Sequence, residues 1–284
     1  MNCPVCEMSK KQKIYKKVNE YSSFICANCD HIYVNDEKLN SIDYSALYGE
    51  EFYENYMSGL GYRKAYNDIL KGDFQKKISL LKKILPEGAE ILEVGSGPGF
   101  FASLLKNEGY RVTPVELTPG AQKYADKSSL QIEIINEDLS DEECSIYNQK
   151  FDCVISWAVI EHVYNAGEFV RLLKRYTKKN GFICIDTGIT TKILSIIDTG
   201  YTSWLFPPLH LHVFSRKSMK HIVEKNGLEV YLFKPFFNYS SSVGKLFLMY
   251  IKKFITALVN MAMVIDKNQE GKTAFIGLIV LRNV

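Results

Sequence analysis

The chain has 284 residues, of which 46% are hydrophobic and 24% are charged, and its formal net charge is +3 at pH 7. This composition excludes an intrinsically disordered chain, and the length accommodates one α/β domain of roughly 200 residues together with a small extra module. The apolar stretch from Leu246 to Ile265 is interrupted by Lys252 and Lys253, so we expect no transmembrane segment.

The cysteines predict a metal site in a reducing compartment. The N-terminus lacks the basic start and apolar run of a signal peptide, so we expect a cytoplasmic chain whose seven cysteines are reduced. Four of them form the pairs Cys3-x-x-Cys6 and Cys26-x-x-Cys29, separated by 19 residues. Each pair can place two thiolates on one tetrahedral ion, which predicts a zinc ribbon over residues 1–40 with a closed, structural Zn²⁺ site. His31 is a further candidate ligand, although four thiolates suffice.

Residues 41–88 are rich in tyrosine and in charge, and parts of this segment have helical spacing. We interpret it as a helical linker that joins the ribbon to the main domain and caps the cofactor site. The clustered tyrosines are Tyr44, Tyr48, Tyr53, Tyr56, Tyr62 and Tyr66.

From residue 89 onward, apolar strands alternate with amphipathic helices, which is typical of a parallel sheet covered on both faces. The predicted strands are Ile91–Val94, Arg111–Glu116, Ile132–Ile135, Phe151–Ser156 and Gly181–Asp186. Helices are predicted between them, for example at Phe100–Glu108 and Glu168–Thr177.

After Asp186 the pattern changes to a loop that contains Pro207-Pro208. Ser215 suits the N-cap of a helix that runs to Asn226 and is ended by Gly227. The last two predicted strands are Leu228–Phe233 and Ala274–Leu281.

A long apolar helical stretch, Val243–Ile265, separates these last strands. Its hydrophobic residues fall near helical spacing, which favours a helix packed on the domain or a homodimer interface. A surface for a lipid-linked acceptor is the alternative, with less support.

The strongest chemical signal is the glycine-rich turn Glu93-Val94-Gly95-Ser96-Gly97-Pro98-Gly99-Phe100. Its glycines let the backbone approach a ligand closely and adopt unusual dihedral angles. Their spacing departs from the dinucleotide fingerprint, because Phe100 stands where the third glycine of that fingerprint would be. The carboxylate of Glu93 would repel a pyrophosphate, but it suits a ligand with an ammonium and a sulfonium.

Further polar residues follow at the carboxyl ends of successive strands, where open α/β sheets bind ligands. Glu116 closes the second strand about 20 residues after the glycine loop, where a carboxylate can accept hydrogen bonds from both ribose hydroxyls. Asp138, after the third strand, can bond the amino group of an adenine. The fourth strand runs into Ser156-Trp157, and Trp157 suits core packing as well as a cofactor contact.

Residues 90–187 resemble the class I S-adenosylmethionine-dependent methyltransferases, especially their small-molecule group. The motifs that carry the resemblance are Glu93-x-Gly95-x-Gly97-x-Gly99, Val115-Glu116, Glu137-Asp138-Leu139 and Phe151-Asp152-x-Val154-x-Ser156 with Glu161-His162. The resemblance implies an α/β fold over residues 89–284, with a Rossmann-like, seven-stranded sheet, an antiparallel last strand and helices on both faces. It also implies S-adenosylmethionine as the cofactor, bound by Glu93, Gly95, Ser96, Gly97, Gly99, Phe100, Glu116, Leu117, Asp138, Leu139 and Trp157.

The ribbon and the tyrosine-rich stretch that starts at Tyr48-Gly49-Glu50 resemble the N-terminal part of methyltransferases that act on nucleotide-linked sugars and related natural products. We therefore expect a small-molecule acceptor, methylated at a hydroxyl of a sugar or natural-product intermediate. A hydroxyl acceptor usually needs a base to take its proton. The candidate bases are His162, just past the fourth strand, and His210 and His212, in the loop after the fifth. Strand-like alternation would put the last two on one face, and one of them can be structural.

Two other functions stay open. An RNA methyltransferase would hold nucleic acid with the ribbon, but residues 1–40 contain six Lys and five Asp or Glu. Nucleic-acid modules are distinctly basic, so we do not expect a nucleic-acid partner. A scaffold without catalytic activity is the second alternative, and the intact glycine loop with Glu116 and Asp138 argues against it.

Overall fold

The structure is a computed structural model that describes residues 2–9, 13–43, 47–49, 51–52, 71–118, 120–127, 130–139, 142–190, 205–236 and 275–284. Of the clustered tyrosines, Tyr48 is described and the other five lie outside these residues, as does the apolar stretch Val243–Ile265. No described helix has both the length and the apolar character that a membrane span requires.

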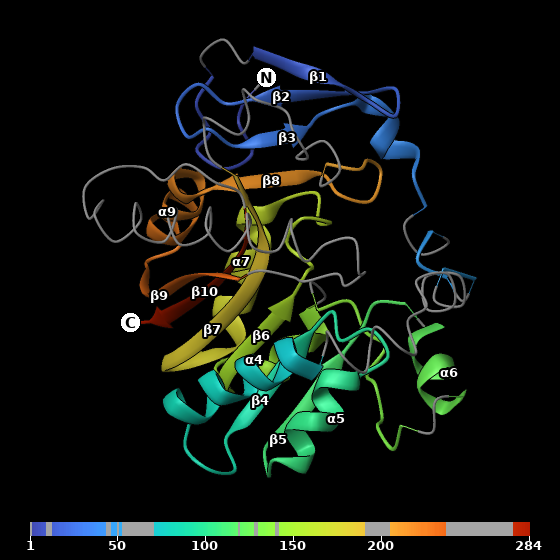
Figure 1. Cartoon of the computed structure of the whole chain (residues 1–284), viewed down its shortest axis with the longest axis vertical. Coiled ribbons are helices and arrows are strands. Elements are labelled where there is room, and N and C mark those ends of the chain that lie inside the picture. The colour runs from blue at the N-terminus through green and yellow to red at the C-terminus, as the bar shows by residue number, and fades with distance from the viewer. Residues whose placement is uncertain are drawn as a thin grey trace, which may run out of the picture.

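The main sheet combines parallel strands with an antiparallel last strand. Its strands are, in spatial order, β5 (Arg111–Val115), β4 (Glu90–Val94), β6 (Phe151–Trp157), β7 (Thr177–Thr190), β10 (Phe275–Asn283) and β9 (Leu228–Phe236). β10 is antiparallel to both of its neighbours, and the pairings among β5, β4, β6 and β7 are parallel (Figure 1). Ile135 forms a parallel bridge with Val115 of β5. It therefore takes a seventh place in the sheet, next to β5. The predicted sheet with an antiparallel last strand is confirmed.

The third predicted strand, Ile132–Ile135, is reduced to that single bridge. Ile135 directs its own N–H and carbonyl to β5, so the backbone groups of Ile132 and Ile134 face the outer edge of the segment. The side chain of Gln122, on α6 (Gly120–Lys127), covers that edge. Its amide oxygen accepts a hydrogen bond from the Ile134 N–H at 2.7 Å, and its amide nitrogen donates to the Ile132 carbonyl at 3.2 Å.

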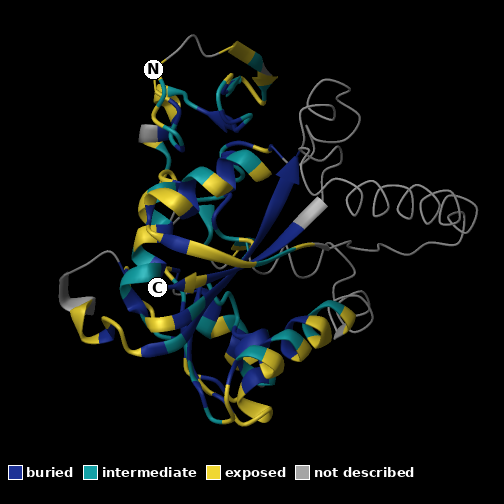
Figure 2. Ribbon diagram, turned by 90° about the vertical axis from the view of Figure 1, so that its left-hand side faces the viewer, coloured by how far each residue is buried: buried dark blue, intermediate teal, exposed yellow. Residues whose placement is uncertain are grey.

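Helices cover both faces of the sheet because successive strand residues point to opposite sides. Ile91 and Ile155 pack on one face with α4 (Lys71–Ile84), α5 (Phe100–Asn107) and α6. Leu92 and Val154 pack on the other face with α7 (Ala166–Tyr176) and α9 (Arg216–Lys225). Figure 2 shows buried strands at the centre and exposed residues along the outer sides of the helices. The described residues also include two 3-10 helices, η1 (Glu37–Ser41) and η3 (Glu142–Tyr147).

The predicted helix between Ser215 and Gly227 is confirmed with its caps. The Ser215 hydroxyl accepts a hydrogen bond from the Ser218 N–H, and the Ser218 hydroxyl accepts one from the Ser215 N–H, so the two residues form a capping box. The helix runs to Lys225 with Asn226 as its C-cap, and Gly227 follows in the left-handed region with a φ of 57°.

The N-terminal ribbon is joined to the main sheet by hydrogen bonds. Its strands β1 (Lys13–Val18), β2 (Tyr21–Ile25) and β3 (Ile32–Val34) are antiparallel, and β3 pairs with β8 (His212–Ser215). β8 in turn pairs in parallel with the end of β7, so that one ten-stranded sheet runs through both parts (Figure 1). A segment that follows the fifth predicted strand thus lies between the ribbon and the main domain.

Candidate functional site

The glycine loop lies between β4 and α5, at the carboxyl end of the parallel strands. Gly95, Gly97 and Gly99 have φ angles of 72°, 50° and 77°, in the left-handed region that favours glycine. A Cβ on Gly95 would lie 2.4 Å from a methyl carbon of Val159, whereas a Cβ on Gly97 would meet no atom within 4 Å. The loop is therefore shaped both by backbone conformation and, at Gly95, by close packing against the segment after β6.

We expect Gly95→Ala to destabilise the protein more than Gly97→Ala. The left-handed conformation costs a side chain about 1–2 kcal/mol at either position, and overpacking adds about 1–3 kcal/mol at position 95. The check is the free energy of unfolding from urea titrations of both variants. Equal losses of unfolding free energy at the two positions would show that Val159 moves aside without an energetic cost.

Glu116 connects the end of β5 to the glycine loop. One carboxylate oxygen accepts a hydrogen bond from the Gly97 N–H at 3.0 Å, and the other accepts from the N–H and the hydroxyl of Thr118 at 3.3 and 3.2 Å. Burial raises the pKa of this carboxyl group. The sequence prediction placed Glu116 at the end of the second strand, and the structure shows in addition that its carboxylate bonds the glycine loop.

Glu93 presents a buried carboxylate oxygen for which the described residues offer no hydrogen-bond partner. The residue is 3% exposed, and Oε2 is the unpartnered atom. Burial raises its pKa to about 8, although nearby Lys77 acts in the opposite direction. An unpartnered buried carboxylate is costly unless a ligand supplies the missing donor. The site therefore suits a ligand that carries a cationic donor, as the sequence prediction required.

Beside Glu93 lies a buried ion cluster that the sequence analysis did not identify. Lys77, on α4, places its Nζ 2.6 Å from Asp186 Oδ2 and 3.3 Å from Asp73 Oδ2. The same Nζ lies 4.4 Å from the ring centre of Trp157, whose indole nitrogen is buried without a partner in the described part of the chain. The other oxygen of Asp186 accepts a hydrogen bond from the Ala158 N–H at 2.7 Å. Asp186 ends a predicted strand and could have been suspected, but Lys77 has no distinguishing pattern.

The segment around Asp138, which the sequence predicts to contact an adenine, lies alongside the end of β5. Asn136, which the sequence analysis missed, donates two hydrogen bonds of 2.8 Å, to the carbonyls of Glu116 and Leu117. Leu117 and Asp138 are exposed, whereas Leu139 is buried and its carbonyl accepts a hydrogen bond from the Tyr176 hydroxyl. Among the remaining predicted contacts, Ser96 and Phe100 are half-buried in and after the loop.

His162 and His210 come together at the carboxyl end of β6. Their ring centres are 4.5 Å apart and their planes are nearly perpendicular, at 84°. His162 Nδ1 lies 2.8 Å from the Tyr48 hydroxyl and 3.1 Å from the Leu209 carbonyl oxygen. Burial, and secondarily His210, lower the pKa of His162 to about 3, so its imidazole is neutral at physiological pH. A proton on Nδ1 can be donated to Leu209, which leaves the lone pair of a general base on Nε2.

Glu161 lies behind this pair and is fully buried. One carboxylate oxygen accepts a hydrogen bond from the Thr187 hydroxyl at 2.9 Å, and the other has no partner among the described residues. Burial raises its pKa to about 8. One ligand atom from each of Glu161, His162 and His210 lies within 4.8 Å of the others, a spacing that a metal ion tolerates.

His212 has different neighbours from the other two candidate bases. It is 2% exposed, its Nδ1 lies 3.1 Å from His31 Nε2, and its Nε2 lies 2.9 Å from the Val163 carbonyl oxygen. Burial lowers its pKa to about 4. The structure therefore separates the histidines of the loop: His210 lies against His162, and His212 lies at the junction with the ribbon.

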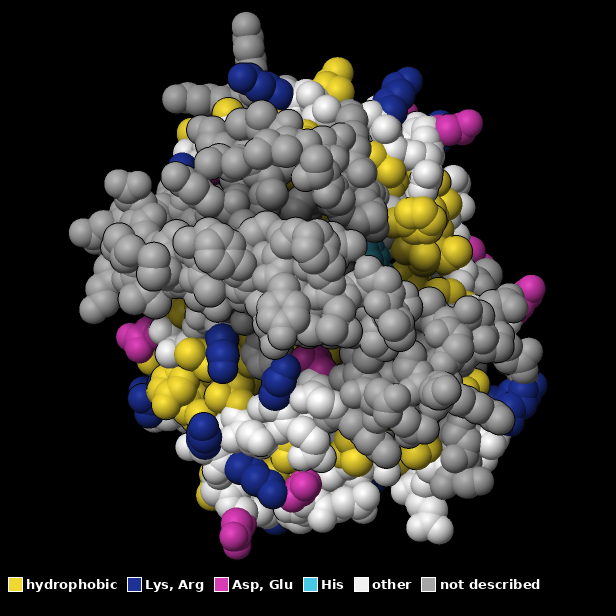
Figure 3. Space-filling view, viewed as in Figure 1, with side chains coloured by type: hydrophobic (Ala, Val, Ile, Leu, Met, Phe, Trp, Pro, Cys, Tyr) yellow, Lys and Arg dark blue, Asp and Glu magenta, His cyan; other side chains and the backbone are white. Residues whose placement is uncertain are grey.

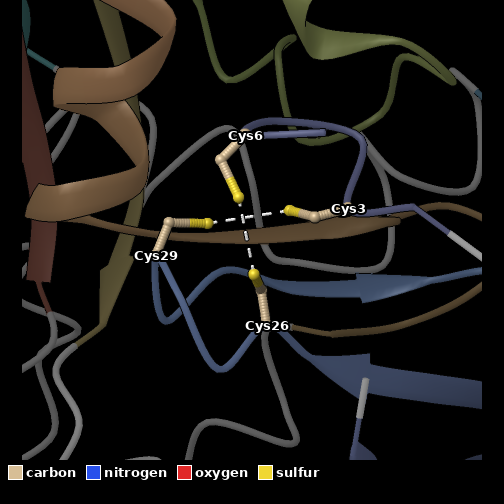
Figure 4. A group of neighbouring side chains, drawn as sticks. All are labelled: Cys3, Cys6, Cys26 and Cys29. Carbon is tan, nitrogen blue, oxygen red and sulfur yellow. Dashed lines mark hydrogen bonds between the residues drawn. The ribbon is translucent and has the colours of Figure 1, made fainter. Parts of the chain in front are cut away.

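The four predicted metal ligands converge on one point (Figure 4). The Sγ–Sγ distances are 3.6 Å for Cys3 and Cys29 and 3.6 Å for Cys6 and Cys26, and all four sulfurs lie within 4.8 Å of one another. A tetrahedral zinc site with Zn–S bonds of about 2.3 Å needs sulfurs about 3.8 Å apart. The cysteine cluster is therefore compatible with zinc.

The two cysteine pairs sit in matching turns. Glu7, four residues after Cys3, and Asp30, four residues after Cys26, donate their N–H groups to the carbonyls of these cysteines at 3.0 and 2.9 Å. Both residues have positive φ angles, 57° and 55°. The repeated turn presents both thiols of each pair to the same side, which is what a shared ion requires.

A separate basic hollow of about 470 Å³ lies at the opposite end of the sheet, next to the start of β7. Its lining residues are Asn148, Gln149, Arg171, Lys174, Arg175, Lys179, Asn283 and Val284. Ligands of open α/β sheets bind at the carboxyl ends of the strands, so this hollow does not belong to the candidate site.

Comparisons with known proteins agree with this geometry. Residues 66–232 match a family described as a methyltransferase domain. The chain is 31% identical over 193 residues to the ubiquinone biosynthesis O-methyltransferase of Rickettsia typhi, covering 60% of this chain and 76% of that protein. It is 30% identical over 155 residues to the Rickettsia conorii protein of the same name, covering 52% of this chain and 50% of that protein.

A similar solved structure is the complex of the Haloferax volcanii Trm112 methyltransferase activator with a methyltransferase. The TM-score is 0.55 at 12% identity, with 85% of this chain and 97% of that chain covered. At this identity the likeness concerns the fold.

Proposed function

Since the chain belongs to the methyltransferase-domain family and is an S-adenosylmethionine-dependent methyltransferase, we propose that it methylates a hydroxyl group of a small molecule, a sugar or another natural-product intermediate. The names of the two Rickettsia relatives support oxygen as the acceptor atom. The observation that carries the proposal is the neutral His162, held against His210 at the carboxyl end of β6.

The residues around the glycine loop fit S-adenosylmethionine. The unpartnered oxygen of Glu93 would accept a hydrogen bond from the ammonium group, and the glycines at 95, 97 and 99 let the backbone approach the ligand. Glu116 would hold the ribose hydroxyls, and Asp138 and Leu139 would flank the adenine. When bound, the cofactor supplies a methyl group already activated by a sulfonium, so alignment of the acceptor accounts for much of the rate.

His162 and His210 would take the proton of the acceptor hydroxyl. His162 is unprotonated at neutral pH and so has a free lone pair for that proton, although its lowered pKa makes it a weaker base than an ordinary histidine. The hydroxyl of Tyr48, 2.8 Å from His162 Nδ1, would hold the ring in place from the segment that we interpret as a cap. These three side chains, from distant parts of the sequence, are the proposed acceptor-side machinery.

Binding of S-adenosylhomocysteine at pH 7 should release roughly one proton from Glu93. With a pKa of about 8 the free carboxyl group is mostly protonated at pH 7, and an ammonium partner favours the ionised form. Isothermal titration in buffers with different ionisation enthalpies measures the release. We expect it to vanish near pH 9.5 and in Glu93→Gln, and a release that does not change with pH would exclude Glu93 as its source.

The acceptor itself can be tested by mass spectrometry. Wild-type protein, S-adenosylmethionine and panels of nucleotide-linked sugars and phenolic natural products should give products heavier by one methylene group, and fragmentation should place the new methyl on oxygen. Methylation confined to nitrogen or carbon would contradict the proposal.

We further propose that the cysteine cluster holds a structural zinc ion and that the protein is cytoplasmic. The RNA-methyltransferase alternative is not favoured by the composition of residues 1–40, in which six Lys stand against five Asp or Glu. Figure 3 shows separate Lys and Arg side chains on the ribbon, at the top of the molecule, with other side chains between them. RNA binding with a steep dependence on salt would favour that alternative.

A further inference from the structure

The segment that carries His210 is attached to the ribbon along its length. Val34 donates its N–H to the Leu211 carbonyl at 2.9 Å, and Asn19 donates from its side chain to the Pro207 carbonyl at 3.2 Å. The Ser215 hydroxyl donates to the carbonyl of Cys29 at 2.6 Å. An apolar cluster adds to these bonds, with six buried members: Ile32, Val34, Leu39, Leu205, Leu211 and Val213.

The same segment is bonded on its other side to the residues around His162. The N–H groups of Leu211 and His212 both point to the Glu161 carbonyl, at 2.8 and 3.3 Å. The Leu209 carbonyl lies 3.1 Å from His162 Nδ1. The segment Leu205–His212 thus lies between the ribbon and the loop that follows β6, and it has hydrogen bonds to both.

His31 and His212 provide the most direct connection across this junction. The Val163 carbonyl accepts only, so His212 carries its proton on Nε2 and its lone pair on Nδ1. His31 must then donate from Nε2 to that lone pair. Both rings are buried among aromatic side chains; His31 lies 5.7 Å from Tyr33 and 4.9 Å from Phe214, between ring centres. In this chain of hydrogen bonds, His31 therefore donates to His212, and His212 donates to the carbonyl of Val163, the residue after His162.

His31 is itself held by the second cysteine turn. Its carbonyl accepts a hydrogen bond from the Cys26 N–H at 2.9 Å, and it follows Asp30, whose positive φ closes that turn. A metal ion on Cys26 and Cys29 would fix the turn and, with it, the place of the His31 ring.

We propose that the cysteine ribbon is a structural part of the acceptor site, and that His31 and His212 are positioning residues that set the geometry of His162 and His210. This inference rests on the proposed function, in which those two histidines act on the acceptor. It assigns the ribbon a role inside the enzyme in place of a separate binding module.

The test compares His31→Leu, which removes the donor, with His31→Gln, whose amide can donate in its place. We expect His31→Leu to lower kcat about tenfold, the lower end of what the loss of an orienting hydrogen bond costs at metal sites. The affinity for S-adenosylhomocysteine and the zinc content should stay at wild-type values. His31→Gln should recover most of kcat, and His221→Leu, on α9 away from this junction, should match wild type.

A readout independent of activity is the ¹⁵N spectrum of the histidine rings. In His31→Leu the chemical shifts of the His162 and His210 rings should differ from those of wild type. They should also change in wild type when a chelator removes zinc, and adding zinc back to that protein should restore them. Asn19→Gly is a milder variant that tolerates the φ of 48° at this position while removing the contact with Pro207, and it should move the His210 signals. It keeps the test open if His31→Leu fails to fold.

The inference is overturned if the signals of His162 and His210 stay in place in these proteins, or if kcat is unchanged. It is also overturned if His31→Leu or zinc removal abolishes S-adenosylhomocysteine binding, because the ribbon would then support the whole fold. Failure of the proposed function has a different signature: wild type would not bind S-adenosylhomocysteine or would transfer no methyl group, while the ring signals would still report on the connection.

Discussion

S-adenosylhomocysteine should bind the wild-type protein and should bind Glu116→Ala at least about 100-fold more weakly. Glu116 offers two carboxylate oxygens at the end of β5, beside the glycine loop. Hydrogen bonds to a charged group contribute about 1.5–3 kcal/mol each, so the loss of two ribose contacts removes about 3 kcal/mol or more. Isothermal titration calorimetry on the two proteins measures the change.

Two controls separate lost ribose contacts from a loosened loop. Thr118→Val removes a hydroxyl that donates to Glu116 at 3.2 Å, but it leaves the carboxylate in place with the Gly97 and Thr118 N–H groups still bonded to it, so the affinity should fall by less than about tenfold. Glu133→Ala changes an exposed carboxylate and should have no effect. If Glu116→Ala binds as tightly as wild type, Glu116 is not a cofactor contact. If folded wild type does not bind at all, the scaffold alternative takes first place.

The double substitution His162→Ala/His210→Ala should reduce turnover about 100- to 10,000-fold, the range that general-base catalysis contributes. The affinity for S-adenosylhomocysteine should be unchanged, because neither histidine belongs to the residues around the glycine loop. Initial rates at saturating S-adenosylmethionine and acceptor, with titration calorimetry on the same preparation, test both statements.

The dependence of rate on pH gives the same prediction a second check. A histidine with an ordinary pKa would lose activity as pH falls through about 6.5. The pKa of His162 is lowered to about 3, so its neutral form persists well below pH 6.5. Protonation of His162 should therefore cause no loss of rate near pH 6.5. His221→Ala is the matched control, as a histidine on α9. Unchanged turnover in the double variant would exclude a histidine base.

Local features of this protein were predictable from the order of its residues. The two cysteine pairs, the glycine loop after a buried strand and the Ser215-to-Gly227 helix each depend on a few neighbouring residues and on backbone preferences. The antiparallel last strand and the helices on both faces were implied by the resemblance to class I methyltransferases, whereas the spatial order of the strands came from the structure. The fold class and the place of Glu93, Gly95 and Glu116 could therefore be stated before any coordinates.

The departures concern contacts that no local pattern announces. Ile132–Ile135 has the composition of a strand, but it is joined to β5 by a single bridge, while the side chain of Gln122 bonds its outer edge. Lys77 looks like an ordinary helix lysine, yet it is buried against Asp186, 109 residues away. Nothing in the sequence near either residue marks the other.

The sequence by itself determined the kind of chemistry, because cofactor and metal motifs are short and local. Only the tertiary structure decided which histidine has which neighbour. His210 and His212 are two residues apart, and alternation predicted one face for both, but the chain enters β8 at His212. That ring is thereby placed against His31, 181 residues earlier, while His210 stays beside His162. Such contacts depend on how β3, β8 and the end of β7 pair across the sheet, and pairing between strands so far apart leaves no periodic trace in the sequence.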